Sequence, residues 1–134
     1  MKNIKINKLK IKFHKKGNII KMMSSNNKNK FGELYISIIK KNKIKGWKFH
    51  KKMHMNLFVI KGKVKFIFYD EKNKKFKKVI NSELSNKKIF VPPKVWFAFQ
   101  NISNSESKIL NFSDIKHNAK ESSNMDINCL PFKW

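Results

Sequence analysis

The chain has 134 residues, 40% of them hydrophobic and 13% aromatic, so we expect one domain, residues 1–134, with one ordinary core. Its only cysteine, Cys129, excludes an intramolecular disulfide and a zinc site built from several thiolates. The net charge of +24 would ordinarily indicate nucleic acid, but all 32 basic residues are lysine, without the bidentate guanidinium that phosphate and base recognition favours. We therefore predict a solvated lysine surface and no nucleic-acid partner.

The first 30 residues contain only short apolar stretches, because lysine or asparagine interrupts each of them. No run of about 18 apolar residues occurs in the chain. We therefore expect a soluble, cytoplasmic protein with no membrane contact. Residues 21–30, KMMSSNNKNK, are predicted to form a polar loop.

Short segments rich in β-branched and aromatic residues follow from residue 33 onward, and turn-forming residues separate them. The predicted strands are Glu33–Ile39, Asn56–Ile60, Lys63–Tyr69, Phe76–Ile80, Ile89–Val91, Val95–Phe99 and Lys108–Phe112. No pattern indicates an amphipathic helix longer than about ten residues. This array predicts an all-β sandwich or barrel, of which the two-sheet jelly roll is the commonest small form.

The third of these strands shows a clear alternation of side chains. Val64, Phe66 and Phe68 fall on one face. The other face carries Lys63, Lys65 and Ile67. We therefore expect only one face of this strand to meet a core.

The segment Lys45–Gly62 places a glycine-led turn before a basic strand that carries Lys48 and His50. Residues two positions apart share a face of a strand, so both side chains project together, either inward or into solvent. Lys48 could act as a base, as a positive contact for a phosphate or sugar oxygen, or as a solvated lysine. His50 could exchange a proton near neutral pH, or only hold a backbone or diphosphate group.

A metal site would need two or three histidines and a carboxylate that converge on one point. His50 and His54 are the only histidines close together, and Asn56 follows them in place of a carboxylate. We therefore predict neither a metal nor another cofactor. The nearby aromatic residues are first of all core candidates, although one or two could stack on a base or sugar. They are Trp47, Phe49, Trp96, Phe97 and Phe99.

The C-terminal part of the chain divides into two segments. Residues 117–128 have the serine and asparagine content of an irregular surface segment. Residues 130–134 are again apolar and include Trp134, which is costly to leave in water. We expect the tail, residues 117–134, to pack on the barrel or on a partner subunit.

Five motifs, in this order, carry a resemblance to a known family. They are FGELY (Phe31–Tyr35), KGWKFHK (Lys45–Lys51), NLFVIKGKVKFIFYD (Asn56–Asp70), VPPKVWFAF (Val91–Phe99) and ILNFSDIKH (Ile109–His117). From Phe31 to Trp134 the chain resembles the dTDP-4-dehydrorhamnose 3,5-epimerase group of cupins, and within it a short branch found among surface-polysaccharide genes. It is more distantly similar to the dTDP-sugar 3,4-ketoisomerases.

The resemblance implies a cupin double-stranded β-helix, a jelly-roll barrel whose mouth holds a nucleotide-linked 4-keto sugar. In such proteins a base removes the proton beside the ketone, and a positive or hydrogen-bonding group stabilises the enolate. By position, the family's catalytic histidine falls on Lys48, its tyrosine near Asn111 and a further histidine on Phe97. His117 matches a histidine in the tail region of the short branch.

The function favoured by this resemblance is epimerisation or isomerisation of a nucleotide-activated keto sugar, with Lys48 and His50 at the reacting centre. The residues expected to bind the substrate are Lys45, Trp47, Lys51, Asn56, Phe97, Phe99, Asn111 and His117. The replaced histidine and tyrosine keep open the alternative of an inactive cupin that binds a sugar nucleotide or assembles the pathway. The resemblance also implies a homodimer, with N-terminal strands and the tail against the neighbour.

Overall fold

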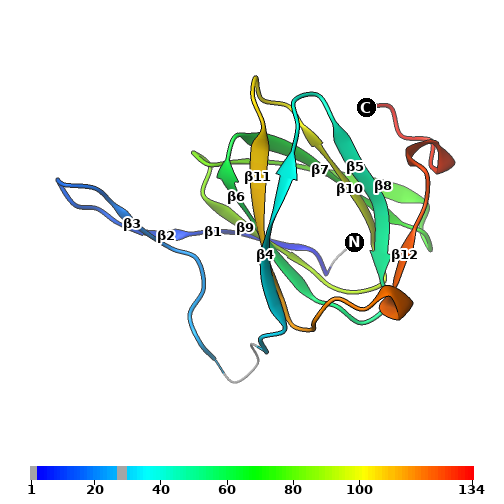
Figure 1. The fold of residues 1–134 in the computed structure, drawn as a ribbon, viewed down its shortest axis with the longest axis horizontal. Helices are drawn as coiled ribbons and strands as arrows, with labels where there is room; N and C mark the ends of the chain where they lie inside the picture. The colour runs from blue at the N-terminus through cyan, green and yellow to red at the C-terminus, as the bar shows by residue number, and fades with distance from the viewer. Residues whose placement is uncertain (1–2, 27–29) are drawn as a thin grey trace.

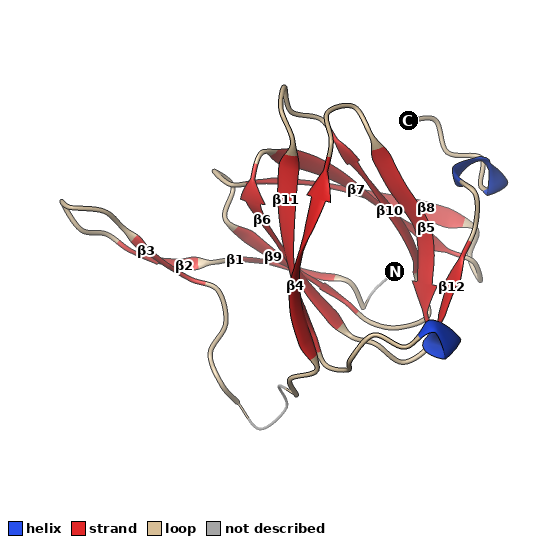
Figure 2. Ribbon diagram, in the orientation of Figure 1, coloured by secondary structure: helices blue, strands red, loops and turns tan. Residues whose placement is uncertain are grey.

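The computed structural model describes residues 3–26 and 30–134, and strands make up almost all of its regular structure (Figures 1 and 2). Two five-stranded antiparallel sheets face each other, in the strand orders β1-β9-β6-β11-β4 and β12-β5-β10-β7-β8. A separate hairpin, β2-β3, projects from this body (Figure 1). The strands are β1 (Lys5–Lys8), β2 (Lys10–Lys12), β3 (Ile19–Lys21), β4 (Glu33–Ile39), β5 (Ile44–His50), β6 (Met55–Lys61), β7 (Lys63–Asp70), β8 (Lys75–Ser82), β9 (Lys87–Val91), β10 (Trp96–Asn101), β11 (Ser107–Ser113) and β12 (Ser122–Asn124). The predicted all-β jelly roll is confirmed.

Every strand predicted from the sequence is present, with ends within two residues of the predicted ones. Strands β1, β2 and β3 were not predicted, because alternating lysine hides their few isoleucines. Within the predicted loop 21–30, Lys21 ends β3, while residues 22–26 and Lys30 have no regular structure and residues 27–29 lie outside the described part. No described helix is long and apolar enough to span a membrane.

The segment 117–128, expected to be irregular, contains a short 3-10 helix, η1 (Ala119–Glu121), followed by strand β12. A second 3-10 helix, η2 (Ile127–Cys129), comes next. β12 pairs antiparallel with β5, bringing Ser122 opposite His50. The prediction was wrong here because serine and asparagine can join a ladder through their backbone groups when a neighbouring strand offers a free edge.

The main hydrophobic core fills the space between the two sheets. Phe66 and Phe68 of β7 lie in it, together with Leu57 of β6 and Ile109 of β11. Burying each such side chain fully stabilises the fold by about 1.5–3 kcal/mol relative to leaving it in water. This core therefore fixes which face of each strand turns inward.

A second, smaller cluster lies on the outer face of the β5-β10-β7 sheet. Ile67 and Trp47 are fully buried there beneath Phe132 and Trp134 of the C-terminal tail. The rings of Trp47 and Trp134 lie 5.7 Å apart between centroids. Both faces of β7 are thus buried, contrary to the expectation from its alternation, because the tail packs on its own barrel.

The two sheets are open to each other along one side. β4 ends its sheet and pairs only with β11, while β5 of the other sheet pairs with β10 and with the short edge strand β12, and not with β4. Figure 1 shows the resulting gap between β4 and β5. Side chains that point inward from these two strands therefore line the candidate functional site.

Candidate functional site

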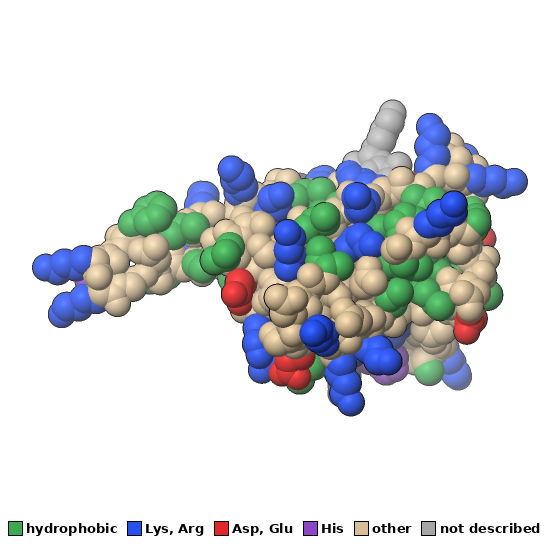
Figure 3. All heavy atoms as spheres, turned by 90° about the horizontal axis from the view of Figure 1, so that it is seen from above, with side chains coloured by type: hydrophobic (Ala, Val, Ile, Leu, Met, Phe, Trp, Pro, Cys, Tyr) green, Lys and Arg blue, Asp and Glu red, His purple; other side chains and the backbone are tan. Residues whose placement is uncertain are grey.

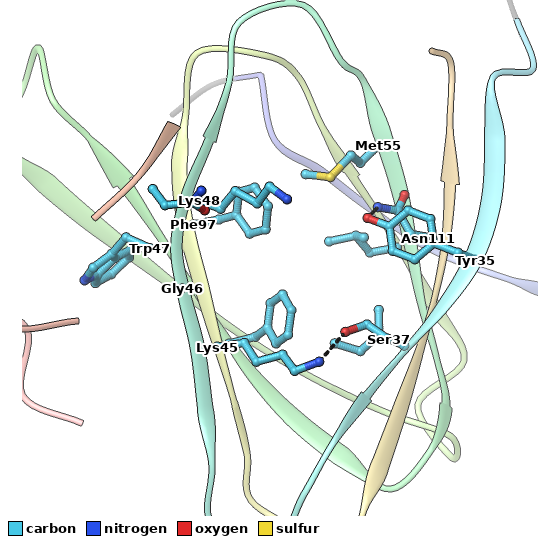
Figure 4. Close-up of a pocket in the computed structure, with 13 residues that line it drawn as sticks. Tyr35, Ser37, Lys45, Gly46, Trp47, Lys48, Met55, Phe97 and Asn111 are labelled. Atoms are coloured by element: carbon cyan, nitrogen blue, oxygen red, sulfur yellow. Dashed lines mark hydrogen bonds between the residues drawn. The ribbon is translucent and has the colours of Figure 1, made fainter. Parts of the chain in front are cut away.

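A cavity of about 340 Å³ lies between the two sheets on this open side (Figure 4). One wall is formed by β5 and β10, and the other by β4, β6 and β11. Its lining residues are Tyr35, Ser37, Lys45, Gly46, Trp47, Lys48, Met55, Leu57, Phe97, Phe99, Ile109, Asn111 and Asn124. The volume lies within the range of about 300–1,000 Å³ that small-molecule sites occupy.

The two walls carry different chemistry. Figure 4 shows Lys45 and Lys48 on one wall, facing Ser37, Tyr35 and Asn111 on the other. The Lys45 ammonium donates a hydrogen bond of 3.1 Å to the Ser37 hydroxyl and so bridges the gap between β5 and β4. The cavity therefore combines two cations with neutral hydrogen-bonding groups and an apolar floor.

A β-bulge in β5 brings both lysines to the same wall. The pairing with β10 jumps from Lys48 to Gly46, so Trp47 has no opposite partner. A bulge inserts one residue and reverses the alternation of faces beyond it. Trp47, next to the inward-facing Lys48, points outward as in a regular strand (Figure 4), while the extra residue of the bulge returns Lys45 to the cavity side.

Gly46 permits the close approach that this bulge requires. Its φ is +140°, and a Cβ atom there would stand 2.4 Å from the Cβ atom of Ala98 on β10. Only glycine fits without displacing the neighbouring strand. The predicted glycine-led turn is thus part of β5 itself.

A recess adjoins this cavity and shares Tyr35 and Lys48 with it. Its lining residues are Glu33, Tyr35, Lys48, His50, Met53 and His117. Here the His117 amide donates to the Glu33 carboxylate over 3.1 Å. The recess gathers most of the titratable side chains of the site.

His50 is only 3% exposed and forms a short, buried contact between its Nδ1 and the Glu121 carboxylate. Glu121 comes from η1 and also accepts hydrogen bonds from the Lys52 and Met53 amides, at 3.2 and 3.4 Å. The other ring nitrogen, Nε2, is buried without a hydrogen-bond partner among the described residues. The sequence offered no signal for this pair, because its members lie far apart in the chain.

The electrostatics of the pair favour an ionised carboxylate beside a neutral imidazole. Burial is the largest influence on the pKa of His50 and lowers it. The hydrogen bond and charge of Glu121 raise this pKa and the charges of Lys48 and His117 lower it, so that the net shift is downward. Burial would raise the pKa of Glu121, but its hydrogen bonds outweigh that effect and the pKa lies below its usual range. We therefore assign the Nδ1 hydrogen to the Glu121 contact, which leaves a lone pair on Nε2.

Tyr35 of β4 is a further cavity residue that the sequence analysis did not single out. Its hydroxyl accepts a hydrogen bond of 2.8 Å from the Asn111 amide on the neighbouring strand β11. Burial raises the pKa of Tyr35, and the Asn111 hydrogen bond opposes that rise in part. The phenol thus lies beside the position where the resemblance expects a tyrosine.

The structure brings together most, but not all, of the residues predicted for the site. Those that line the cavity or its recess through their side chains are Lys45, Lys48, His50, Phe97, Phe99, Asn111 and His117. Trp47 contributes only backbone, because it alternates with the inward-facing Lys48 and its ring lies in the outer cluster.

Lys51 and Asn56 lie elsewhere. Lys51 is exposed beyond the end of β5, with its ammonium 3.5 Å from the Lys120 carbonyl oxygen. Asn56 points to the outer face of β6, into a depression that also contains a hydrogen-bonded pair, His54 and Asp114. Within the described residues, no three His, Cys, Asp or Glu side chains are grouped as a metal site would need.

The fold and this cavity define the chain as a cupin. The family model FdtA, described as WxcM-like, C-terminal, matches residues 2–126, so the chain belongs to this family. No curated protein sequence matched.

Several solved structures share the fold. A dTDP sugar isomerase from Desulfovibrio desulfuricans G20 is 22% identical with a TM-score of 0.90, over 98% of this chain and 90% of that one. A dTDP-4-dehydrorhamnose 3,5-epimerase from Bacillus anthracis is 17% identical with a TM-score of 0.85, over 98% and 85%. The sugar 3,4-ketoisomerase QdtA from Thermoanaerobacterium thermosaccharolyticum is 16% identical with a TM-score of 0.75, over 90% and 87%.

Proposed function

We propose that this protein binds a nucleotide-linked 4-keto sugar between β4 and β5 and moves a proton beside the ketone, as an epimerase or isomerase of surface-polysaccharide synthesis in the cytoplasm. The observation that carries the proposal is the buried His50–Glu121 pair, whose free nitrogen belongs to a ring that lines the recess together with Lys48. The family, and neighbours named as dTDP-sugar isomerases and epimerases, support the same chemistry.

His50 is the base in this proposal. Its lowered pKa keeps the imidazole neutral at neutral pH, so Nε2 can accept the proton from the sugar carbon. The electron pair of the broken C–H bond moves onto the ketone oxygen and forms an enolate. The Glu121 carboxylate holds the ring in place and stabilises the imidazolium that results.

Lys48 has a different role, as a positive contact for oxygen. Its ammonium points into the cavity from the same strand as His50 (Figure 4). A fixed cation beside a developing enolate lowers the barrier to proton removal because it stabilises the new negative charge. Lys45 and Ser37 would hold a second oxygen of the sugar or diphosphate deeper in the cavity.

The test is deuterium incorporation in heavy water, with dTDP-, GDP- and CDP-linked 4-keto sugars offered in turn. We expect exchange at a carbon beside the ketone with at least one of them. The His50→Ala variant should lower the exchange rate by roughly 10²–10⁴-fold, the usual contribution of a general base. Lys48→Ala should also slow exchange, through the loss of enolate stabilisation.

Two matched variants serve as controls. His54→Ala removes a histidine that pairs with Asp114 on the outer face, and Lys78→Ala removes an exposed lysine of β8. Both should exchange at the wild-type rate. Saturable binding without exchange would contradict the catalytic proposal and support a binding protein. Binding of duplex DNA with a steep salt dependence, and of no sugar, would reject both.

We also propose a homodimer, formed through the outer face of the β4 sheet and the β2-β3 hairpin. An isolated two-stranded hairpin is marginally stable in water, so the projecting hairpin needs a surface to pack on. Both regions expose large apolar side chains, which Figure 3 shows on the hairpin among the lysines. They are Phe13, Ile19 and Ile20 on the hairpin, and Leu34, Ile36 and Ile38 on β4. A second copy would cover both at once.

A further inference from the structure

We propose that the depression beside His54, on the outer face of the β1-β9-β6-β11-β4 sheet, is a second ligand site that binds a phosphate group. Its volume is about 470 Å³, larger than the cavity between the sheets. Met55 and Leu57 of β6 line that inner cavity, whereas Asn56 between them lines the depression. The sheet therefore separates the two sites, and this inference is independent of the proposed sugar chemistry.

Three strands place a lysine, an aromatic ring and an amide in one row of this outer face. Lys5 of β1 lies opposite Phe90 of β9, and Phe90 lies opposite Asn56 of β6. Side chains directly opposite each other on one face of a sheet are neighbours, with Cβ atoms about 4.5–5.5 Å apart. Lys88, two residues before Phe90, falls on the same face and adds a second ammonium group. The register of the sheet thus brings both lysines to the depression.

His54 is held next to this row by a carboxylate and by an aromatic ring. The Asp114 carboxylate accepts hydrogen bonds of 2.8 Å from both the backbone amide and Nδ1 of His54. The imidazole stacks on Phe90 with 6.0 Å between centroids, and the Lys5 ammonium lies 6.0 Å from the centroid of the same ring. Because Asp114 occupies Nδ1, Nε2 is the nitrogen left for a ligand, and it has no hydrogen bond to any described residue. The His54 side chain is 46% exposed, so a ligand can reach it.

The charge of the lining fits a phosphate group. Lys5, Lys30 and Lys88 contribute three positive charges and Asp114 one negative charge, so the lining carries +2 with His54 neutral. None of these three lysines forms an ion pair with another described residue. A phosphate dianion would neutralise this charge, and its oxygens can reach several donors at once. It also suits the imidazole in either protonation state, since it accepts from an imidazolium or donates its own hydroxyl to Nε2.

The phosphate group can arrive as inorganic phosphate or as part of a nucleoside monophosphate. The depression is large enough for either, because small-molecule sites occupy about 300–1,000 Å³. The Phe90 ring and the Asn56 amide lie beside the lysines and would contact a sugar or base attached to the phosphate. Tighter binding of dTMP than of inorganic phosphate would identify a nucleotide ligand, and equal affinities would identify the phosphate group alone.

Nuclear magnetic resonance of the His54 ring tests the site in the full chain. The chain has four histidines, and the His54 signal is the one lost in His54→Ala. Inorganic phosphate or dTMP, added at constant pH and at an ionic strength held with sodium chloride, should shift this signal and saturate. Lys88→Ala should weaken the apparent affinity by about tenfold, because a charged contact is lost. Lys78→Ala, an exposed lysine on β8 of the other sheet, is the matched control and should bind as the wild type does.

Two results would overturn the site. A shift that stays linear with phosphate concentration, or that Lys88→Ala and Lys78→Ala reduce equally, would leave only non-specific attraction to a basic surface. Loss of the shift in Lys48→Ala would place the bound phosphate in the cavity between the sheets instead. A saturable shift that Lys48→Ala retains and Lys88→Ala weakens supports the site, whatever the outcome of the deuterium-exchange experiment.

Discussion

The candidate base depends on one contact between residues 71 positions apart in the chain. Glu121 is held by two backbone amides as well as by His50, so its carboxylate cannot turn away without losing all three partners. A carboxylate fixed in this way keeps the imidazole in one orientation and one tautomer. The reactivity of His50 is therefore a property of the pair.

Replacing Glu121 with glutamine tests this directly. The Glu121→Gln amide keeps a similar shape but no charge, so it stabilises the imidazolium less, and we expect exchange to slow by roughly 10²-fold. Glu106→Gln, on an exposed carboxylate 3.9 Å from Lys61, should have no effect. Equal exchange rates in the two variants would remove Glu121 from the mechanism.

The pH dependence of exchange identifies the base. Since the pKa of His50 is lowered and the neutral ring accepts the proton, the rate should rise with pH and level off below neutrality. Lys48 and His117 lower this pKa while Glu121 raises it, so Glu121→Gln should move the rise to still lower pH. A rise that continues into alkaline pH would instead assign the base to a lysine, whose usual pKa is about 10.4.

At the scale of an element, the bulge in strand β5 determines which of its side chains face the cavity. Lys45 and Lys48 reach the cavity, while Trp47 between them packs outward beneath the tail. A regular strand would have placed Lys45 with Trp47 on the outer face. Because of the bulge, one strand supplies two lysines to the cavity and a tryptophan to the outer cluster.

Gly46→Ala should disrupt this arrangement. The new methyl group would approach Ala98 to 2.4 Å at a φ of +140°, and we expect a loss of stability on the order of 1–3 kcal/mol in urea unfolding. Gly17→Ala is the matched control, since Gly17 has a similar φ of +135° but open space around it. If both variants lose the same amount, backbone strain alone matters and the close approach does not.

The C-terminal tail should stabilise the barrel through its aromatic contacts. Trp134 packs on Trp47 and, at 4.9 Å, on Phe132, so Trp134→Ala should lower the free energy of unfolding by about 2–3 kcal/mol. Leu84→Ala, at a side chain that is 87% exposed, should change it little. Equal stabilities of the two variants would show that the tail does not contribute to folding.

At the scale of the whole molecule, lysines and exposed apolar side chains occupy different parts of the surface. Lysines cover much of the surface shown in Figure 3, whereas exposed isoleucine and leucine collect on β4 and on the projecting hairpin. Lysine repulsion opposes non-specific association, so a dimer has to form through a defined apolar face. The proposed dimer uses that face.

Ile36→Asp tests the dimer, since it places a charge in the middle of the exposed β4 face. We expect the wild-type protein to elute as a dimer in size-exclusion chromatography with light scattering, and the variant as a monomer. Leu84→Asp, away from that face, should remain dimeric. A wild-type monomer at micromolar concentration would contradict the proposal.

The sequence by itself determined the fold class and most strands, because alternation and β-branched residues report directly which segments have a face to bury. It also placed Lys48 and His50 on the same face, since they lie two positions apart on one strand. The sequence could not predict contacts between distant segments: Glu121 reaches His50 from the short helix η1, and Tyr35 meets Asn111 through the register of β4 and β11. Only the tertiary structure decided these, and brought Lys45 to the cavity side, because a bulge and the order of strands in a sheet depend on packing among elements rather than on the pattern within one.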